Sequence, residues 1–251
     1  MNTFSACVLI PVYDHEGAIE ATCASVRALG LPIVLVDDGC HAPCAKVLDR
    51  LKKRENYYLV RLTRNRGKGA AVRAGLSEAQ RLGFTHALQI DADGQHEPAD
   101  LPAFLEHALH NRDCLIIGYP HFDESVPRHR YYSRYITHVW VWLNTLSLAI
   151  RDTMCGVRLY PLAELNRMLA QQPCGNRMDF DTEVLVRWYW RGGKVHNLPV
   201  RVHYPRDGIS HFRLFRDNVL MARMHLRLTG GMLLRSYQLL ARRLMARRRQ
   251  S

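Results

Sequence analysis

Short apolar runs alternate with amphipathic stretches over the first 120 residues, and this alternation limits the possible folds more than any other feature. The runs are rich in β-branched or aromatic residues and end at polar turns, as strands do. The predicted strands are Cys7–Tyr13, Ile33–Val36, Tyr57–Leu62, Thr85–Ile90 and Cys114–Gly118. Helical spacing of apolar residues predicts helices over Ala18–Leu29, Pro43–Lys53, Gly69–Leu82 and Leu101–His110. Such a repeat predicts an α/β fold with a mostly parallel sheet flanked by helices.

The pattern changes after residue 120. A polar loop over Pro120–Arg130 precedes an aromatic-rich helix that we predict over Tyr131–Ile150. The remaining predicted elements are a strand over Gly156–Pro161, helices over Leu162–Ala170 and Thr182–Arg191, an extended segment over Val195–Tyr204, and a helical region over Phe212–Arg249 broken at Gly230-Gly231. We therefore expect a domain over residues 1–211, with halves 1–118 and 119–211, and a helical tail over 212–251.

Positive charge is concentrated at the C-terminus. The formal net charge is +12, and residues 201–251 hold twelve Arg, two Asp and no Lys or Glu, so +10 falls there and +2 on the first 200 residues. Apolar residues interleave with these Arg at near-helical spacing: Leu214, Phe215, Val219, Met224, Leu228, Leu233, Leu234, Tyr237, Leu240 and Leu244. This pattern predicts a basic amphipathic helix in peripheral contact with an anionic membrane.

Two alternatives to a membrane helix stay open. The apolar positions could pack on a partner helix instead. The charge is also typical of a nucleic-acid-binding protein, but that class does not explain the acidic turn described below, and the tail has few aromatic residues for base stacking. We therefore expect no nucleic-acid partner.

Hydropathy and cysteine content predict a cytoplasmic protein, peripheral on the inner face of the cell membrane. The longest uncharged run, Tyr135–Ile150, is shorter than the roughly 20 residues that span a bilayer. The apolar start lacks the cationic segment of a signal peptide. Seven scattered cysteines, an odd number, suit reduced thiols better than a disulfide framework.

The turn after the fourth predicted strand carries the residues best suited to chemistry. It reads Asp91-Ala92-Asp93-Gly94-Gln95-His96-Glu97-Pro98. Side chains alternate along extended backbone, so Asp91, Asp93 and Gln95 can point the same way. Two carboxylates and an amide oxygen suit Mg²⁺ or Mn²⁺. An acidic turn that caps the next helix, with Asp100 as the N-cap, is the alternative.

Two other turns have features that suit a nucleotide. Val36-Asp37-Asp38-Gly39 offers carboxylates that can accept hydrogen bonds from a ribose or a base edge. Arg64-Asn65-Arg66-Gly67-Lys68-Gly69 lacks the order of a P-loop. It still places cations and backbone N–H groups at the start of a predicted helix, where a diphosphate can bind.

Four motifs in register resemble family-2 inverting glycosyltransferases. Pro-x-Tyr, Val-Asp-Asp-Gly, Asn-x-Gly-Lys-Gly and Asp-x-Asp-x-Gln-His-x-Pro follow one another at predicted strand ends, and the resemblance covers roughly residues 5 to 210. It is greatest to the dolichyl-phosphate mannose synthase-like and polyprenyl-phosphate glycosyltransferase branch. The resemblance implies a GT-A fold, with a Rossmann-like sheet, a nucleotide-sugar half over 1–118, an acceptor half over 119–211 and a basic amphipathic helical extension.

The resemblance also implies a reaction. A single sugar would move, with inversion, from a UDP- or GDP-linked donor to a membrane-associated lipid or lipid phosphate, with Mg²⁺ or Mn²⁺ as cofactor. A lipid phosphate is already ionised near neutral pH and needs no base. A glycolipid, polyene or polyketide hydroxyl is the alternative acceptor, and it would need a carboxylate base.

Individual residues take roles from the same resemblance. Residues expected at the nucleotide sugar are Pro11, Tyr13, Asp37, Asp38, Lys68, Asp91 and Arg206, the last in a Gly-x-Ser loop that closes over the diphosphate. The expected metal ligands are Asp91, Asp93 and Gln95. Residues expected at the acceptor are Arg130, Ser133 and Arg134. The expected catalytic residues are Asp93, Asp152 and Asp181, with Glu183 as a further candidate base; for Asp179 and Asp181, helix N-capping is the alternative.

Overall fold

Seven strands and eight α-helices make up the part of the chain that the computed structural model describes: the backbone of residues 3–121, 128–203 and 214–248, with side chains for 3–120, 134–203 and 215–242. The strands are β1 (Ala6–Val12), β2 (Ile33–Asp37), β3 (Tyr57–Arg61), β4 (His86–Gln89), β5 (Cys114–His121), β6 (Arg158–Pro161) and β7 (Lys194–Arg201). The helices are α1 (Ile19–Ser25), α2 (Ala42–Leu51), α3 (Lys68–Arg81), α4 (Leu101–His110), α5 (Arg128–Thr145), α6 (Leu162–Gln171), α7 (Asp179–Trp190) and α8 (Leu214–Arg248), with short 3₁₀ helices at Arg27–Leu29 and Pro98–Asp100.

The strands form one sheet in the order β3-β2-β1-β4-β6-β5-β7. All neighbouring pairs are parallel except those of β6, which runs antiparallel to both β4 and β5. The predicted mostly parallel α/β sheet is thus confirmed. The reversed strand brings Arg158 beside Gln89, the last residue of β4. The start of β6 therefore lies at the same end of the sheet as the acidic turn that follows β4.

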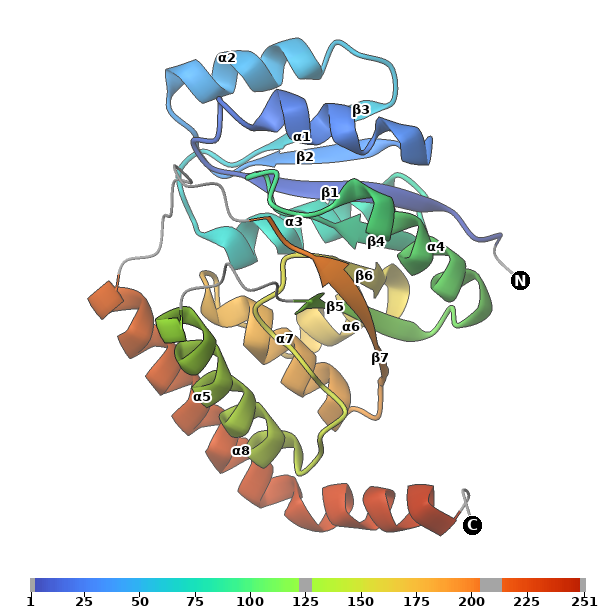
Figure 1. Cartoon of the computed structure of the whole chain (residues 1–251), viewed down its shortest axis with the longest axis vertical. Coiled ribbons are helices and arrows are strands. Elements are labelled where there is room, and N and C mark those ends of the chain that lie inside the picture. Colours follow the sequence, from blue (N-terminus) through green and yellow to red (C-terminus); the bar gives the residue numbers. More distant parts are fainter. Residues whose placement is uncertain (1–2, 122–127, 204–213, 249–251) are drawn as a thin grey trace.

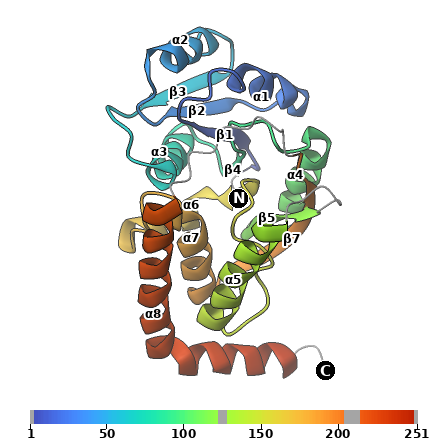
Figure 2. The same ribbon diagram turned by 60° about the vertical axis from the view of Figure 1, so that its left-hand side comes forward.

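Helices cover both faces of this sheet (Figures 1 and 2). Along β1 the buried side chains alternate, with Cys7 and Leu9 in one apolar core and Val8 and Ile10 in the other. The first core includes residues of α3, α6, α7 and α8, and the second includes residues of α1, α2 and α4. The amphipathic periods in the sequence were therefore sufficient to locate the helices of both layers.

The helices α5, α7 and α8 pack against one another, and Figure 2 shows them together at the end of the molecule opposite β3. The Trp190 Nε1–H donates to the carbonyl of Asn144 at 2.8 Å, which ties α7 to α5. Arg227 of α8 contacts the buried carboxylate of Glu183 on α7 at 2.8 Å. In the described part of the chain, no helix combines the length and apolar character that crossing a bilayer requires.

Helix α8 differs from the sequence prediction in two ways. It continues through Gly230-Gly231, so the predicted break is wrong, although the helix changes direction towards its C-terminal end (Figure 1). Met224 and Leu228, expected in a membrane-facing row, are buried in the core instead. A hydrophobic period shows that a helix has an apolar face but does not show what covers it. The division of the chain at residue 211 stays a prediction.

We expect the same substitution to have opposite effects at the two adjacent glycines of α8. A Cβ at Gly231 would lie 2.7 Å from the Trp190 ring, whereas one at Gly230 would meet nothing within 4 Å. Gly231→Ala should therefore destabilise the protein by about 1–3 kcal/mol through overpacking. Gly230→Ala should stabilise it by roughly 0.5–1 kcal/mol because alanine favours the helix. Thermal unfolding of both variants measures this, and equal Tm shifts would contradict the packing of α8 on α7.

Candidate active site

The carboxylates after β2 shape the turn that leads into α3. Asp38 is buried and accepts hydrogen bonds from the backbone N–H groups of Arg66 at 2.7 Å and Gly67 at 2.8 Å. Gly67 has a φ of 98°, and a Cβ there would lie 2.6 Å from the carbonyl oxygen of Asn176, so only glycine fits. Burial raises the pKa of Asp38 against the effect of these hydrogen bonds. Asp38 thus fixes the backbone from which Lys68 extends.

The neighbouring Asp37 and the first turn have their own contacts. Asp37 accepts from the backbone N–H of Cys40 and from Arg61 Nε, both at 2.7 Å. Asp14 binds His41 twice, through the ring Nδ1 at 2.6 Å and the backbone N–H at 2.8 Å. Tyr13 follows the last residue of β1, and its ring centroid is 6.3 Å from that of His41. Together with Pro11 near the end of β1, these residues lie at the strand ends where the nucleotide is expected, and their roles in nucleotide binding stay predictions.

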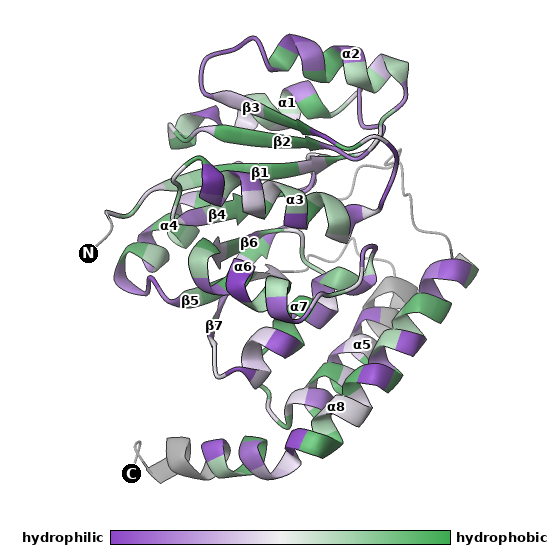
Figure 3. Ribbon diagram, turned by 180° about the vertical axis from the view of Figure 1, so that it is seen from behind, coloured by the Kyte–Doolittle hydropathy of each residue, from purple (hydrophilic) through white to green (hydrophobic). Residues whose placement is uncertain are grey.

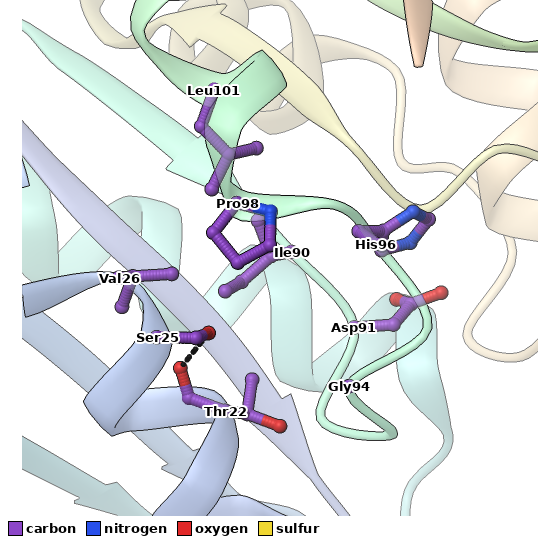
Figure 4. Close-up of a pocket in the computed structure, with 9 residues that line it drawn as sticks. All are labelled: Thr22, Ser25, Val26, Ile90, Asp91, Gly94, His96, Pro98 and Leu101. Atoms are coloured by element: carbon purple, nitrogen blue, oxygen red, sulfur yellow. Dashed lines mark hydrogen bonds between the residues drawn. The ribbon is translucent and has the colours of Figure 1, made fainter. Parts of the chain in front are cut away.

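The acidic turn after β4 is attached to α1. Figure 4 shows the chain turning at Gly94, with Asp91 and His96 on the side away from Thr22. The hydroxyl of Thr22 donates to the carbonyl of Ala92 at 3.1 Å, and the small cavity between loop and helix, about 10 Å³, has room for a single water. Asp93 Oδ1 accepts from the backbone N–H of Gln95 at 3.1 Å.

These oxygens suit a hard divalent cation. Asp91, Asp93 and Gln95 are all partly exposed, and they supply two carboxylates and an amide. A Cβ at Gly156 would lie 2.1 Å from Asp91 Oδ2, so this glycine leaves the space that the carboxylate fills. Among the described side chains, no group of three or more His, Cys, Asp or Glu residues is arranged to hold a metal ion. The expected ligand set differs from such a group because its third ligand is the amide of Gln95.

A line of alternating charges extends from this turn into the protein. Lys68 Nζ lies 2.7 Å from Asp91 Oδ1 and 3.1 Å from Asp181 Oδ2. Burial favours the neutral amine, but Asp181 and Asp91 outweigh it and raise the pKa of Lys68, so the ammonium remains charged. Behind Asp181 lies Arg158, whose Nη1 is 3.3 Å from Asp181 Oδ1.

Arg158 is fully buried and satisfied by backbone carbonyls. It donates to Thr153 at 2.6 Å, to Asp181 at 2.7 Å and to Cys155 at 3.1 Å. Its partners come from two segments that lie apart in the chain, so no local sequence pattern gives Arg158 a role. It orders the loop before β6 and the first turn of α7.

A second polar cluster lies beside α5. Arg134 binds Asp152 through two hydrogen bonds, of 2.5 and 2.8 Å, and His138 Nε2 lies 3.2 Å from the same carboxylate. Burial opposes ionisation of Asp152, but the hydrogen bonds from His138 and Arg134 outweigh it and hold the pKa of this carboxyl well below its usual range.

This cluster lines a cavity of about 260 Å³, whose lining residues are Tyr119, Pro120, Arg134, Tyr135, His138, Arg151 and Asp152. The Arg151 guanidinium stands over the Tyr119 ring at 5.2 Å. Arg151 and His138 belong to no recognisable motif, so neither residue was expected at the site. The cavity therefore has three basic side chains against one buried carboxylate.

His96 lies within electrostatic reach of both clusters. Its pKa is lowered chiefly by burial, with Asp91 and Asp93 acting in the opposite sense and Lys68 and Arg134 adding to the decrease. The backbone on either side of it pairs with the end of β7: His203 N–H donates to the Gln95 carbonyl at 2.8 Å, and Glu97 N–H donates to the Arg201 carbonyl at 3.1 Å.

The remaining predicted residues are placed as follows. Arg206 lies outside the described residues, and so do the side chains of Arg130 and Ser133, whose backbone belongs to α5. Glu183 is fully buried between Arg187 and Arg227. Asp179 and Asp181 are in the first turn of α7, but the N-cap residue is Met178. Asp100 is the N-cap of α4 without a side-chain capping bond and binds Arg201 instead.

Comparison with known proteins decides the family. The model of glycosyl transferase family 2 matches residues 7–222, which is most of the chain. The chain belongs to this family. It is therefore a glycosyltransferase, as the four motifs imply, and the seven-stranded sheet is that of the GT-A fold.

One curated relative is an undecaprenyl-phosphate 4-deoxy-4-formamido-L-arabinose transferase of Pseudomonas paraeruginosa. It is 30% identical over 181 residues, which cover 69% of this chain and 51% of the relative, so the chain spans about half its length.

Two solved structures share the fold. Glucosyl-3-phosphoglycerate synthase of Mycobacterium tuberculosis, solved with Mn²⁺ and UDP-glucose, matches with a TM-score of 0.67 and 14% identity, over 90% of this chain and 79% of that one. The mannosyltransferase PcManGT of Pyrobaculum calidifontis, solved with GDP-Man and Mn²⁺, matches with a TM-score of 0.59 and 16% identity, over 93% and 65%. At these identities the similarity establishes the fold.

Removing the buried guanidinium should destabilise the whole family-2 domain. Arg158→Lys keeps the charge but loses the planar fork, leaving carbonyls unsatisfied, and we expect a loss of about 3–5 kcal/mol in unfolding free energy. Urea unfolding measures it. Arg167→Lys, in an exposed pair with Glu164, is the matched control and should stay within about 0.5 kcal/mol of wild type. Similar stabilities of the two variants would contradict the role of Arg158.

Proposed function

We propose that this chain transfers one sugar, with inversion and with Mg²⁺ or Mn²⁺ bound, from a nucleoside-diphosphate sugar to a membrane-associated lipid phosphate. The observation that carries the proposal is the closeness of two unlike clusters: the acidic turn at Asp91–Gln95 and the basic cavity at Arg134 and Arg151. The segment from Asp152 to Gly156 joins them: Asp152 accepts a hydrogen bond from the backbone N–H of Cys155 at 2.7 Å, and the next residue, Gly156, lies against the Asp91 carboxylate. One cluster suits a metal diphosphate and the other suits the phosphate of an acceptor.

The donor would bind along the ends of β1, β2 and β4. Pro11, Tyr13, Asp37 and Asp38 would line the nucleoside side and Lys68 would contact the diphosphate; Arg206, outside the described residues, keeps the same expected role. Asp91, Asp93 and Gln95 would hold the cation, which when bound neutralises charge on the departing diphosphate. Two structures of the same fold are solved with Mn²⁺ and either UDP-glucose or GDP-Man, which supports this part of the proposal and leaves both nucleotides open.

The acceptor phosphate would enter the 260 Å³ cavity. Arg134 and Arg151 supply its positive charge. Arg130 lies four residues before Arg134 on α5, and Ser133 lies one residue before it. Asp152 holds the Arg134 guanidinium in place through both hydrogen bonds. An acceptor oxygen then forms a bond to the anomeric carbon as the bond to the diphosphate breaks, and the electron pair leaves with the diphosphate.

The state of the candidate bases favours a phosphate over a hydroxyl acceptor. Asp152, Asp181 and Glu183 all lie in ion pairs with Arg or Lys. A hydroxyl acceptor would have to compete with these partners for the carboxylate oxygens, and the lowered pKa of Asp152 makes that carboxylate a weak base. A lipid phosphate needs no base, since it is already ionised near neutral pH. The name of the Pseudomonas relative, an undecaprenyl-phosphate transferase, points to the same class of acceptor.

Exposed apolar rows on α5 and α8 support contact with a membrane. The α5 row comprises Tyr135, Ile136, Val139, Trp140 and Leu143, which share one helix face. The α8 row comprises Phe215, Leu226, Leu233, Leu234, Tyr237 and Leu240. Hydrophobic and hydrophilic positions alternate along α8 (Figure 3). Tyr135 also lines the basic cavity, so a lipid chain lying against the α5 row would have its phosphate close to Arg134.

Donor binding tests the enzymatic part of the proposal. Calorimetry with a panel of UDP- and GDP-sugars should show binding to wild type that requires Mn²⁺ or Mg²⁺. Asp93→Ala should weaken it at least about tenfold, because the variant lacks one charged ligand. Asp113→Asn, which removes an exposed carboxylate just before the start of β5, should bind as wild type does. Metal-independent binding, or no binding of any donor, would refute the proposed use of the metal.

Vesicle flotation tests the membrane part. Wild type should float with vesicles containing phosphatidylglycerol, and less so at high salt, because each arginine near an anionic surface contributes about 1 kcal/mol. Ile136→Glu and Leu234→Glu, in the two rows, should each reduce flotation severalfold through burial of a charge. Leu109→Glu on α4 is the control, since Leu109 is also exposed (49%) but belongs to neither row. Equal loss in all three variants would argue against these rows as the contact surface.

A further inference from the structure

The contact between Lys68 and Asp91 conflicts with the role expected of each. Asp91 is an expected metal ligand, yet its Oδ1 is 2.7 Å from the Lys68 ammonium. Its other oxygen lies against Gly156, where a Cβ would approach to 2.1 Å. The carboxylate has therefore little room to turn away from Lys68. A divalent cation that binds this oxygen must displace or repel an ammonium that is already there.

Lys68 already has a second carboxylate partner. Asp181 Oδ2 lies 3.1 Å from the same Nζ, and the fully buried Arg158 holds Asp181 from behind. Asp38 fixes the backbone just before Lys68 through the N–H groups of Arg66 and Gly67. Three backbone carbonyls fix Arg158, so Lys68 is the long side chain of this group that can shift. Its ammonium can therefore leave Asp91 and stay on Asp181, or contact a diphosphate, while the groups around it stay in place.

We propose that Lys68 competes with the metal ion for Asp91, so that the ion binds weakly to the free protein and tightly only together with a nucleoside diphosphate. The diphosphate brings negative charge that both cations can share, and it draws the ammonium off Asp91. Because linkage is reciprocal, the metal strengthens nucleotide binding by the same factor. This inference rests on the proposed function, since it assumes that Asp91 faces a metal diphosphate.

Mn²⁺ titration, followed by the electron paramagnetic resonance signal of the free ion, tests the competition without any turnover. Wild type should bind Mn²⁺ weakly alone and at least about tenfold more tightly with saturating UDP or GDP. Lys68→Met should bind Mn²⁺ alone about tenfold more tightly than wild type and gain much less from the nucleotide. Lys68→Arg keeps the cation and should stay weak alone. Lys194→Met, which removes a lysine paired with Asp113, controls for net charge and should behave as wild type does.

Asp181→Asn gives an independent check with the opposite sign. Without its second partner, Lys68 stays on Asp91, so Mn²⁺ alone should bind more weakly than to wild type while the nucleotide restores much of the affinity. This variant keeps the backbone carbonyl that Arg158 uses, which favours folding.

The outcomes separate the inference from the proposed function. If Lys68→Met, shown by circular dichroism to be folded, binds Mn²⁺ alone no better than wild type, the competition is refuted while nucleotide-dependent Mn²⁺ binding still supports the proposed metal site. If Lys68→Met does not fold, an unchanged Mn²⁺ affinity in Asp181→Asn refutes it. If wild type binds no Mn²⁺ even with UDP or GDP, both the metal-dependent function and the inference fail.

Discussion

The candidate site depends on one buried guanidinium. Arg158 begins the reversed strand β6, which lies between β4 and β5, so its side chain emerges where three segments meet. Carbonyls of the loop before β6 and of the first turn of α7 satisfy it, and it pairs with Asp181. A buried charge that loses its partners is costly, so these segments hold one another in a single arrangement. Through Asp181 and Lys68 the same constraint reaches Asp91.

This arrangement gives the site fixed charges of alternating sign before any ligand arrives. Asp91, Lys68, Asp181 and Arg158 follow one another at ion-pair distance, and Arg134 and Asp152 repeat the pattern at the basic cavity. Preorganised charges cost little reorganisation during reaction, which is how enzymes that transfer charged groups lower their barriers. The compensation also means that a cation at Asp91 must share or replace the Lys68 ammonium, and an anion at Arg134 must share that guanidinium with Asp152.

The sequence predicted the parts of this molecule that depend on local pattern. Strand and helix positions follow from hydrophobic period, and the first four helices differ from prediction by only a few residues at their ends. The acidic turn was found because its carboxylates lie within five residues of each other. The place of β6 was not predicted, since period does not encode strand order or direction. Lys68 and Asp181 were each expected at the site, but their contact spans 113 positions in the chain and no local motif records it.

The C-terminal positive charge is another feature whose role the sequence pattern alone does not determine. Several arginines of the predicted membrane helix serve the fold: Arg227 pairs with Glu183, Arg242 donates to the Trp190 carbonyl at 2.7 Å, and Arg235 lies over the Trp190 ring at 5.0 Å. Arg216 and Arg223 are exposed and take no part in these three contacts. The net charge of this segment therefore overstates the charge available to an anionic surface.

These internal contacts nevertheless favour the proposed membrane contact. A free amphipathic tail loses conformational entropy each time it folds on a bilayer, roughly 1–2 kcal/mol for each backbone residue that becomes ordered. The described part of α8 is already helical and is held by its arginines against α7, so it presents its exposed apolar row without that cost. Because the described part of α8 is already ordered, it needs fewer exposed arginines and apolar side chains to bind a membrane than a disordered tail would.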